Sequence, residues 1–272
     1  MLSNGILQGK RGLIFGALNE HSLAWAVAKQ CAAEGASLVL TNTPIALRMG
    51  ELNTLAKTIN APVIAADATS IDDLNRLLKE AQELLGGKID FALHAVAMSQ
   101  NLRRGKRYEN LSYNYLLQTL DISAISFHKF LQTAYQMDAL SEGASVVALS
   151  YIASQRAFWG YNDMADAKAL LESIARNFGL IYGKEKKVRI NVVSQSPTQT
   201  TAGGSISYFT NMFEIAEHTS PLGNATAEDC ARMCAMLFSD YTRKITMQTL
   251  YHDGGFSATG IQVNSEIPWK QM

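Results

Sequence analysis

The stretch Arg11-Gly-Leu-Ile-Phe-Gly16-Ala-Leu-Asn-Glu-His-Ser22-Leu-Ala24 decides the fold. It starts as a short apolar run, passes through a glycine and a polar turn, and continues in a helical pattern. Gly16 permits a tight turn close to a ligand, and Ser22 can cap the helix and bond a phosphate. The amides at the start of such a helix carry positive potential. This unit predicts a phosphate-binding turn, although a single glycine is weak evidence alone and the stretch is not G-x-G-x-x-G.

The same alternation of apolar runs and helical patterns continues along the chain. We expect strands at residues 11–16, 37–41, 61–66, 90–95, 144–149, 188–193 and 245–251. We expect helices at residues 23–34, 70–85, 115–136, 162–182 and 226–238. Several of the apolar runs are almost wholly Val, Ile, Leu and Ala, as is typical of parallel strands covered on both faces. The pattern predicts a single α/β domain over residues 1–272, a Rossmann-like doubly wound parallel sheet of about seven strands flanked by helices.

Composition limits the classes of function. Lys and Arg together number 24, as do Asp and Glu, so the net charge is zero and we expect no nucleic-acid or anionic-membrane partner. The chain has three cysteines, Cys31, Cys230 and Cys234. So small and odd a number argues against a disulfide framework. Cys230 and Cys234 lie one helical turn apart, but no other ligands complete a metal site, so core packing is favoured and no metal is expected. With no signal-peptide core and no membrane-length apolar run, we expect a cytoplasmic protein.

The segment Tyr161-Asn-Asp-Met-Ala-Asp-Ala-Lys168 carries the candidate chemistry. Its two end residues are seven positions apart, which is two helical turns, so on a helix they share a face. An ammonium beside a phenol stabilises the phenolate form, and such a pair can stabilise or protonate an oxyanion formed when hydride is delivered to a substrate. Tyr151 lies ten residues upstream. The alternative reading is a surface pair on the same helix.

Candidate nucleotide contacts lie at the ends of the expected strands. Asp67 ends the third strand, where its carboxylate either accepts from an adenine amino group or only forms a turn. Ala95-Val-Ala97 ends the fourth strand with small residues that let a nucleotide approach or simply pack. Thr41-Asn42-Thr43 follows the second strand, without the acidic residue common in NAD sites or the Arg common in NADP sites. Arg48 follows within reach, so cofactor phosphorylation stays open from these residues alone.

Taken together, these residues make the chain similar to the enoyl-acyl-carrier-protein reductases, the NADH-type enzymes of bacterial fatty-acid synthesis in the short-chain dehydrogenase/reductase superfamily. The resemblance covers essentially the whole chain. It rests on Gly16-x5-Ser22-Leu23-Ala24, Asp121-Ile-Ser-Ala-Ile-Ser-Phe127, Leu149-Ser-Tyr151, Tyr161-x6-Lys168, Ser196-Pro197-x-x-Thr200 and His252-Asp-Gly-Gly-Phe256. The wider superfamily uses Tyr-x3-Lys. Tyr182 and Lys186 have that spacing, but they lie near the end of a long expected helix and are not interpreted as catalytic.

The resemblance implies hydride transfer from the nicotinamide to the β-carbon of a trans-2-enoyl thioester. Tyr161 would hold the enolate oxygen, Lys168 would bind the nicotinamide ribose, and Tyr151 would line the substrate pocket and assist. The implied cofactor contacts are Gly16, Ser22, Leu23, Asp67, Ala68, Ala97, Lys168, Thr198 and Thr200. The implied substrate contacts are Ala97, Met98, Ser99, Tyr151, Tyr161, Phe209 and Met212. Phe209 and Met212 belong to a substrate lid around residues 203–216, entered through Gly203-Gly204.

The resemblance also implies partners, and it has departures. Family members are usually homotetramers that receive the substrate on acyl carrier protein. The basic residues 100–114 either meet that carrier or form a solvated loop. Ala97 stands where Gly is usual, Gln195-Ser196 replaces Ala-Gly, and Gln199 stands where a basic residue is frequent. These changes bear on lid closure and cofactor preference.

NADH is the expected cofactor over NADPH, because the neutral residues 41–43 offer no guanidinium to a 2′-phosphate. Two alternatives remain at this point. One is a short-chain reductase acting on a ketone or pterin, and the other is a non-catalytic nucleotide-binding relative.

Overall fold

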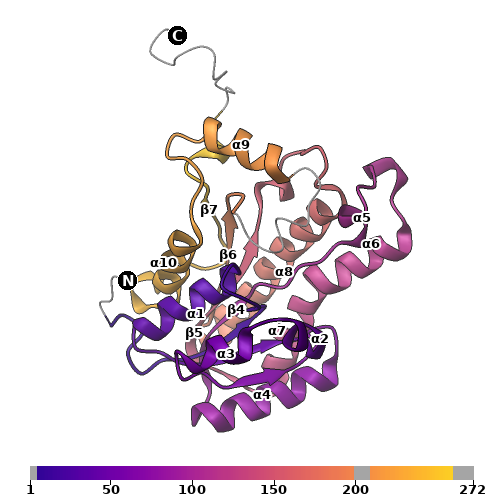
Figure 1. Ribbon diagram of the computed structural model, residues 1–272. Helices are drawn as coiled ribbons and strands as arrows, with labels where there is room; N and C mark the ends of the chain where they lie inside the picture. Colours follow the sequence, from indigo (N-terminus) through magenta and orange to yellow (C-terminus); the bar gives the residue numbers. More distant parts are fainter. Residues whose placement is uncertain (1–4, 199–208, 260–272) are drawn as a thin grey trace.

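Seven parallel strands form one sheet at the centre of the molecule (Figure 1). The computed structural model describes residues 5–198 and 209–259. The strands are β1 (Arg11–Phe15), β2 (Ser37–Asn42), β3 (Val63–Ala65), β4 (Ile89–His94), β5 (Leu140–Ser150), β6 (Arg189–Gln195) and β7 (Thr249–His252). Their order is β3-β2-β1-β4-β5-β6-β7, and every neighbouring pair is parallel. The doubly wound α/β prediction is confirmed, and the order reverses between β1 and β4, where such sheets bind ligands.

Helices cover both faces of this sheet (Figure 1). One face packs against α1 (Leu23–Ala33) and α10 (Ala227–Phe238), and the other against α4 (Ile71–Leu85), α7 (Ser126–Gln136) and α8 (Asn162–Lys186). Side chains of one strand alternate between the two cores: Leu13 and Phe15 point to one, and Ile14 to the other. Because both faces are buried, the strands read as continuous apolar runs.

Several elements differ from the sequence expectation. The helix expected at residues 115–136 consists of α6 (Tyr113–Leu120), a π-helical segment η2 (Asp121–Ile125) and α7. Further helices that periodicity did not predict are α2 (Pro44–Met49), α3 (Leu52–Lys57), α5 (Gln100–Arg103) and α9 (Phe209–Thr219). Short 3-10 turns occur at η1 (Tyr108–Asn110), η3 (Ile152–Ser154), η5 (Asp240–Thr242) and η6 (Phe256–Ala258). Segments of six residues or fewer, such as α2, α3 and α5, are too short to show a helical period. Within the described ranges, none of the helices has the length and apolar character needed to cross a membrane.

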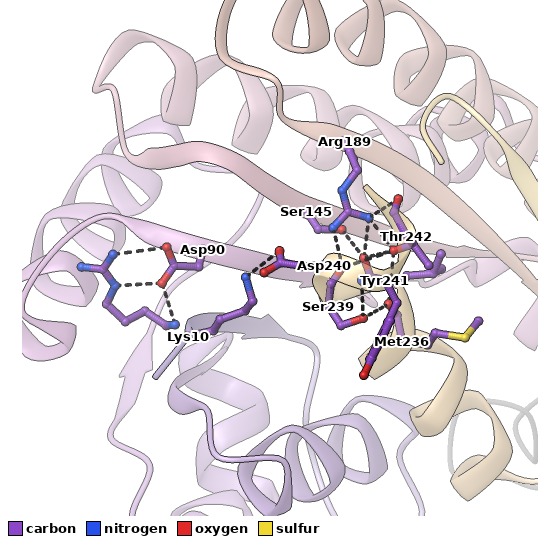
Figure 2. Close-up of polar contacts among 11 residues, drawn as sticks. Lys10, Asp90, Ser145, Arg189, Met236, Ser239, Asp240, Tyr241 and Thr242 are labelled. Atoms are coloured by element: carbon purple, nitrogen blue, oxygen red, sulfur yellow. Dashed lines mark hydrogen bonds and ion pairs between the residues drawn. The ribbon is translucent and has the colours of Figure 1, made fainter. Parts of the chain in front are cut away.

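A buried arginine joins β6 to the end of α10 (Figure 2). Arg189 Nη1 donates to the carbonyl oxygen of Leu237 at 2.8 Å and to Thr242 Oγ1 at 2.7 Å, while Nη2 donates to Ser239 O at 3.0 Å. Leu237 and Ser239 lie at the carboxyl end of the helix, where unpaired carbonyls carry negative potential. This cation therefore anchors the start of β6, and β6 leads to the predicted site residues after Gln195.

Candidate active site

Gly16 brings the loops after β1 and β4 into contact. Its φ is +91°, and a Cβ there would lie 2.1 Å from the backbone oxygen of Ala95, so only glycine fits. The Gly16 amide donates to Thr41 O at 3.0 Å, which also ties this turn to β2. The turn after β1 is thus in contact with β2 and with the segment after β4, the neighbours of β1 in the sheet.

Ser22 shapes the turn before α1. Its Oγ accepts from Leu18 N at 3.2 Å and Trp25 N at 3.3 Å and donates to Asn19 O at 2.9 Å, so the hydroxyl is fully engaged. The amides of Leu23 and Ala24 make no hydrogen bond to other described residues. Two free amides at the start of an eleven-residue helix suit a phosphate. The backbone therefore fits the pyrophosphate of a dinucleotide, and Ser22 acts in this structure as the helix cap.

Asn42 supports the same turn from the end of β2. Its Nδ2 donates to Ala17 O at 2.8 Å, and its Oδ1 accepts from Thr43 N at 2.8 Å. Both ends of the amide are occupied by backbone. Thr43 caps α2, and Arg48 is exposed in the last turn of that helix. The residues after β2 thus brace the phosphate turn and place no guanidinium within it.

Asp67 forms a turn after β3. One carboxylate oxygen, Oδ1, accepts from both Thr69 N and Thr69 Oγ1 at 2.8 Å. The Asp67 amide donates to Asp73 Oδ2 at 2.8 Å, and Ala68 is buried beside it. The structure therefore shows Asp67 as a turn residue, one of the two roles expected for it. The other oxygen of Asp67 makes no hydrogen bond to described residues, so the expected adenine contact stays a prediction.

Tyr151 and Tyr161 face each other. Their ring centroids are 4.9 Å apart with planes inclined at 53°, and Phe158 packs on Tyr151 at 5.4 Å. Both tyrosines are buried, and the Tyr151 hydroxyl has no hydrogen-bond partner among the described residues. Burial raises the pKa of both phenols above the usual range. The expectation that Lys168 favours the phenolate of Tyr161 is therefore wrong for this structure; both phenols stay protonated and can donate a hydrogen bond.

Lys168 points to the end of β5. Its Nζ donates to the carbonyl oxygen of Leu149 at 2.8 Å. Burial lowers the pKa of this ammonium to about 8, and the nearby Glu172 carboxylate acts in the opposite direction. Glu172 itself is buried and accepts from Ser150 Oγ at 2.7 Å and Ser154 Oγ at 2.6 Å. Glu172 was not identified from the sequence, although its position four residues after Lys168 is a readable helix-pair signal.

Helix α8 begins at Asn162, so Tyr161 precedes the helix rather than occupying its face. Asn162 adopts a left-handed φ of 49° and donates from Nδ2 to Lys106 O. Asparagine is one of the few residues that adopts this region readily. The left-handed conformation of Asn162 turns the chain between Tyr161 and the helix. The expectation that Tyr161 and Lys168 share one helix face therefore does not describe this structure.

Asp163 is a fully buried carboxylate that sequence reasoning missed. It accepts from Ser99 Oγ at 2.7 Å, Asn101 Nδ2 at 2.8 Å and Thr119 Oγ1 at 2.9 Å. These donors come from the segment after β4 and from α6. The sequence signal for Asp163 is an acidic residue that adjoins an apolar helical stretch. A carboxylate buried by such a stretch needs dedicated hydrogen-bond donors, so its position suggests that partners lie nearby.

The predicted substrate contacts after β4 have different surroundings. Ala97 is exposed, and Met98 N donates to Ser123 Oγ at 3.0 Å. Ser99 is buried, and besides donating to Asp163 it accepts from Leu102 N at 3.0 Å as the cap of α5. The Ser99 hydroxyl is therefore occupied in holding this segment to α8, while Ala97 is open to a ligand. The substrate roles of these residues stay predictions.

His94 at the end of β4 is a buried neutral imidazole. Ser126 Oγ donates to Ile122 O at 2.7 Å, so in its 3.0 Å contact with His94 Nε2 the ring nitrogen is the donor. Burial lowers the pKa of His94 to about 3, and the positive charge of Lys168 adds to that effect. Its packing between Phe15 and Phe127 indicates a structural role.

Gln195 and Ser196 depart from the usual family pattern and are built into the end of β6. Gln195 Nε2 donates to Thr198 Oγ1 at 3.1 Å and to Ala225 O at 3.2 Å, while its Oε1 accepts from His252 Nδ1 at 2.7 Å. Ser196 Oγ accepts from Ala225 N at 2.8 Å. The larger side chains therefore link the turn that holds Thr198 to β7 and to the loop before α10.

The predicted lid is described only in part. Thr200 and the lid residues up to 208 lie outside the described residues, and Phe209 is the first residue of α9. Met212 is buried and belongs to the same core cluster as Tyr151 and Tyr161. Helix α9 thus contributes one side chain to the core that contains the tyrosine pair.

The three cysteines are buried in the core between the sheet, α1 and α10. In the part of the chain that the structure describes, no group of three or more His, Cys, Asp or Glu side chains is arranged to hold a metal.

Comparison with known proteins shows the family of the chain. A family model described as Enoyl-(Acyl carrier protein) reductase matches residues 16–257. The chain belongs to this family. A curated relative, the enoyl-[acyl-carrier-protein] reductase [NADH] 2 of Rhizobium meliloti (strain 1021), is 34% identical over 263 residues, which is 95% of each chain. The family predicted from the residues is confirmed.

Solved structures agree with this assignment. The FabI–NADH complex from Alistipes finegoldii is 58% identical, with a TM-score of 0.94 over 95% of this chain and 91% of that one. The Bacillus cereus enoyl-acyl carrier protein reductase with NADP+ and indole naphthyridinone is 26% identical, with a TM-score of 0.87 over 94% of this chain and 99% of that one. Enoyl reductases of this fold have thus been solved with either cofactor.

Proposed function

We propose that this chain is an NADH-dependent enoyl-acyl-carrier-protein reductase of fatty-acid elongation in which Tyr161 and Lys168 do the chemistry and Tyr151 assists. The observation that carries the assignment of residues is the contact between the rings of Tyr151, directly after β5, and Tyr161, 4.9 Å apart. Lys168 reaches the same end of β5 through its bond to Leu149 O. Bound NADH supplies the hydride that ends on the β-carbon of the enoyl thioester.

The chain's own residues then handle the charge that remains. Adding hydride to the β-carbon leaves negative charge on the thioester oxygen, which a donor already in place stabilises. The raised pKa of Tyr161 keeps its phenol protonated, so the hydroxyl can donate to that oxygen. Tyr151 has a buried hydroxyl without a partner among the described residues and is available as a second donor. Lys168 holds positive charge below about pH 8, and its ammonium lies at the end of β5, two residues before Tyr151.

The cofactor end of the site is made by the first two strands. The free amides of Leu23 and Ala24 are placed to receive the pyrophosphate, and Gly16 leaves room for the approach of the loop after β4. The side chains of Asn42 and Thr43 are neutral, and both form hydrogen bonds with backbone groups. These two residues therefore offer no cation to a 2′-phosphate. This arrangement favours NADH over NADPH.

The test is turnover of a neutral enoyl thioester, crotonyl-N-acetylcysteamine, followed by NADH absorbance. We expect NADH oxidation with the enoyl thioester, a lower kcat/KM with NADPH, and no oxidation with the matching 3-ketoacyl thioester. Tyr161→Phe is the matched control for the site. Turnover of the ketone in place of the enoyl thioester would instead support another short-chain reductase. NADH binding without any turnover would support a non-catalytic relative.

We further propose that the protein is a cytoplasmic homotetramer that receives its substrate on acyl carrier protein. Family membership supports this, since the resemblance implies such an assembly and carrier. Sedimentation equilibrium of the purified chain tests the assembly, and a monomer at all concentrations would contradict it.

A further inference from the structure

Four exposed cations stand on one short segment beside the tyrosine pair. They are Arg103, Arg104, Lys106 and Arg107, here called the basic patch, and they lie between Leu102 of α5 and Tyr108 of η1. Glu109 is the only acidic residue within residues 100–114, so this segment carries a net charge of +3 in a chain of net charge zero.

The charge of the basic patch is largely unpaired. Glu109 pairs with Arg107, whose side chain remains 73% exposed. Among the described residues no carboxylate lies within ion-pair distance of Arg103, Arg104 or Lys106. Arg104 rests over the ring of Tyr115 at 5.2 Å, which holds its guanidinium on the surface. A positive surface that the chain itself does not neutralise is free to attract an anionic partner.

This patch is fixed to the first turn of α8. The carbonyl of Lys106 accepts from Asn162, the residue directly after Tyr161. Asn101 bonds Asp163 with its side chain and also accepts from Ser112 N at 3.0 Å, so the segment is anchored on both sides of the cations. Tyr108 adds a bond to Asp166 at 3.2 Å. The patch therefore keeps a defined position relative to the candidate catalytic tyrosine.

Helix α9 and the segments around it carry the reverse charge. The sequence contains no Lys or Arg between Arg189 and Arg232, a span that includes α9 with Glu214 and Glu217. Figure 1 shows α5 and α9 in the same upper half of the molecule, on different sides of it. A negatively charged protein that approaches this end is attracted to the basic patch and repelled from α9.

We propose that the basic patch is the docking surface for the acyl carrier protein that delivers the enoyl thioester, and that it receives an acidic face of that carrier. This inference rests on the proposed function. The carrier must stay outside while its thioester reaches Tyr161, so a surface held next to Asn162 is well placed to receive it. Exposed charges of this kind act mainly by steering the encounter, and they raise association rates by about 10 to 1,000 fold at low salt.

The experiment compares two substrates with the same acyl group, crotonyl-acyl carrier protein and crotonyl-N-acetylcysteamine. The test variant is Arg103→Glu with Lys106→Glu, because neither side chain makes a hydrogen bond or ion pair with other described residues. The matched control is Lys184→Glu with Lys187→Glu, an equal charge change at exposed positions about 35 Å away along α8. A milder variant, Arg103→Gln with Lys106→Gln, removes the charge without reversing it.

We expect the test variant to lower kcat/KM for crotonyl-acyl carrier protein by about tenfold or more at low salt. The milder variant should have an intermediate effect, and the control should stay within about twofold of the parent. All variants should turn over the neutral thioester like the parent, and the parent's preference for the carrier-bound substrate should weaken as salt rises.

Two results would overturn the docking surface alone. One is an unchanged kcat/KM for the carrier-bound substrate in the test variant, and the other is an equal loss in the control. A parent protein that turns over neither thioester would overturn the proposed function itself.

Discussion

The ammonium of Lys168 donates to the carbonyl oxygen of Leu149 across 2.8 Å, although the residue is only 6% exposed. One neutral carbonyl does not replace the hydration that the charge has lost, so burial lowers the pKa of Lys168 to about 8. Glu172 offsets part of this effect, and its carboxylate is in turn held by Ser150 and Ser154. The charge that the proposed chemistry needs is therefore present at neutral pH and lost within a moderately alkaline range.

We predict that kcat/KM for NADH falls as pH rises through about 8. Lys168 is a base whose pKa is lowered, so it is charged below that value and neutral above it. The profile of kcat/KM reports the free enzyme. Lys168→Arg is the control, because a guanidinium stays charged across this range. If the falling limb kept its position in an active Lys168→Arg variant, the titrating group would be another residue.

We predict that Tyr161→Phe lowers kcat by about two to three orders of magnitude, the usual effect of losing one oxyanion donor. Tyr151→Phe should cost less, since its hydroxyl would only assist. Tyr182→Phe is the control: its hydroxyl is buried and donates to Leu131 O at 2.9 Å, so its loss should cost about 1 kcal/mol of stability without changing kcat. A large kcat loss in Tyr182→Phe with an active Tyr161→Phe would reverse the assignment.

Most of the fold could be predicted because it depends on local pattern. All seven strands were expected from runs such as Leu13 to Phe15, since burial on both faces leaves a readable apolar signature. Helices α2, α3 and α5 were missed because a period needs more residues than they contain. The π-helical segment at Asp121–Ile125 has no known composition signal of its own, and its position beside the buried His94 depends on tertiary packing.

The site could be predicted in its residue types but not in its electrostatics. Tyr161 and Lys168 were found by spacing, yet the sequence argument expected a lowered pKa for the Tyr161 phenol, and the structure raises it. Burial in a core that includes Tyr151, ten residues away, and Met212, from a separate helix, raises the pKa of Tyr161, and spacing carries no information on burial. Asp163 was missed for the same reason, since its donors come from segments about 45 to 65 residues away.

We predict that His94 makes the protein less stable in mild acid. Burial holds the pKa of His94 at about 3, whereas the unfolded chain binds the proton near 6.5. Stability is complete above 6.5 and is lost as pH falls from there toward 3, because only the unfolded state takes up the proton. Between about pH 7.5 and about pH 5 this amounts to roughly 2 kcal/mol.

The measurement is urea unfolding at both pH values. His94→Gln retains a donor for Ser126 and cannot titrate, so its loss of stability on acidification should be smaller by roughly 2 kcal/mol. His21→Gln is the control, because His21 is exposed. Equal acid sensitivity in the parent and His94→Gln would mean that other groups dominate.

The final prediction concerns Asp163, which joins the segment after β4 to the first turn of α8. Both carboxylate oxygens accept hydrogen bonds, so Asp163→Leu leaves the Ser99 hydroxyl and one Asn101 N–H without an acceptor, while Thr119 keeps the Tyr115 carbonyl. Each lost bond costs about 1–3 kcal/mol if water does not enter. Asp163→Asn keeps the shape and one accepting oxygen, but its amide must face Ser99, which already accepts from Leu102 N. We therefore expect stability to fall modestly in Asp163→Asn and strongly in Asp163→Leu.

Activity should fall beyond what the lost stability explains. The same bonds hold the segment that contains Ala97 against the turn that contains Tyr161, and a displacement of about 1 Å between reacting groups can cost up to about 100-fold in rate. We expect kcat for crotonyl-N-acetylcysteamine to drop in Asp163→Asn under conditions where the variant is fully folded by circular dichroism. Asp166→Asn makes the same chemical change three residues later, where the partner is the exposed Tyr108, and should leave kcat near the parent value. Full kcat in a folded Asp163→Asn variant would show that the carboxylate stabilises the chain without positioning Tyr161.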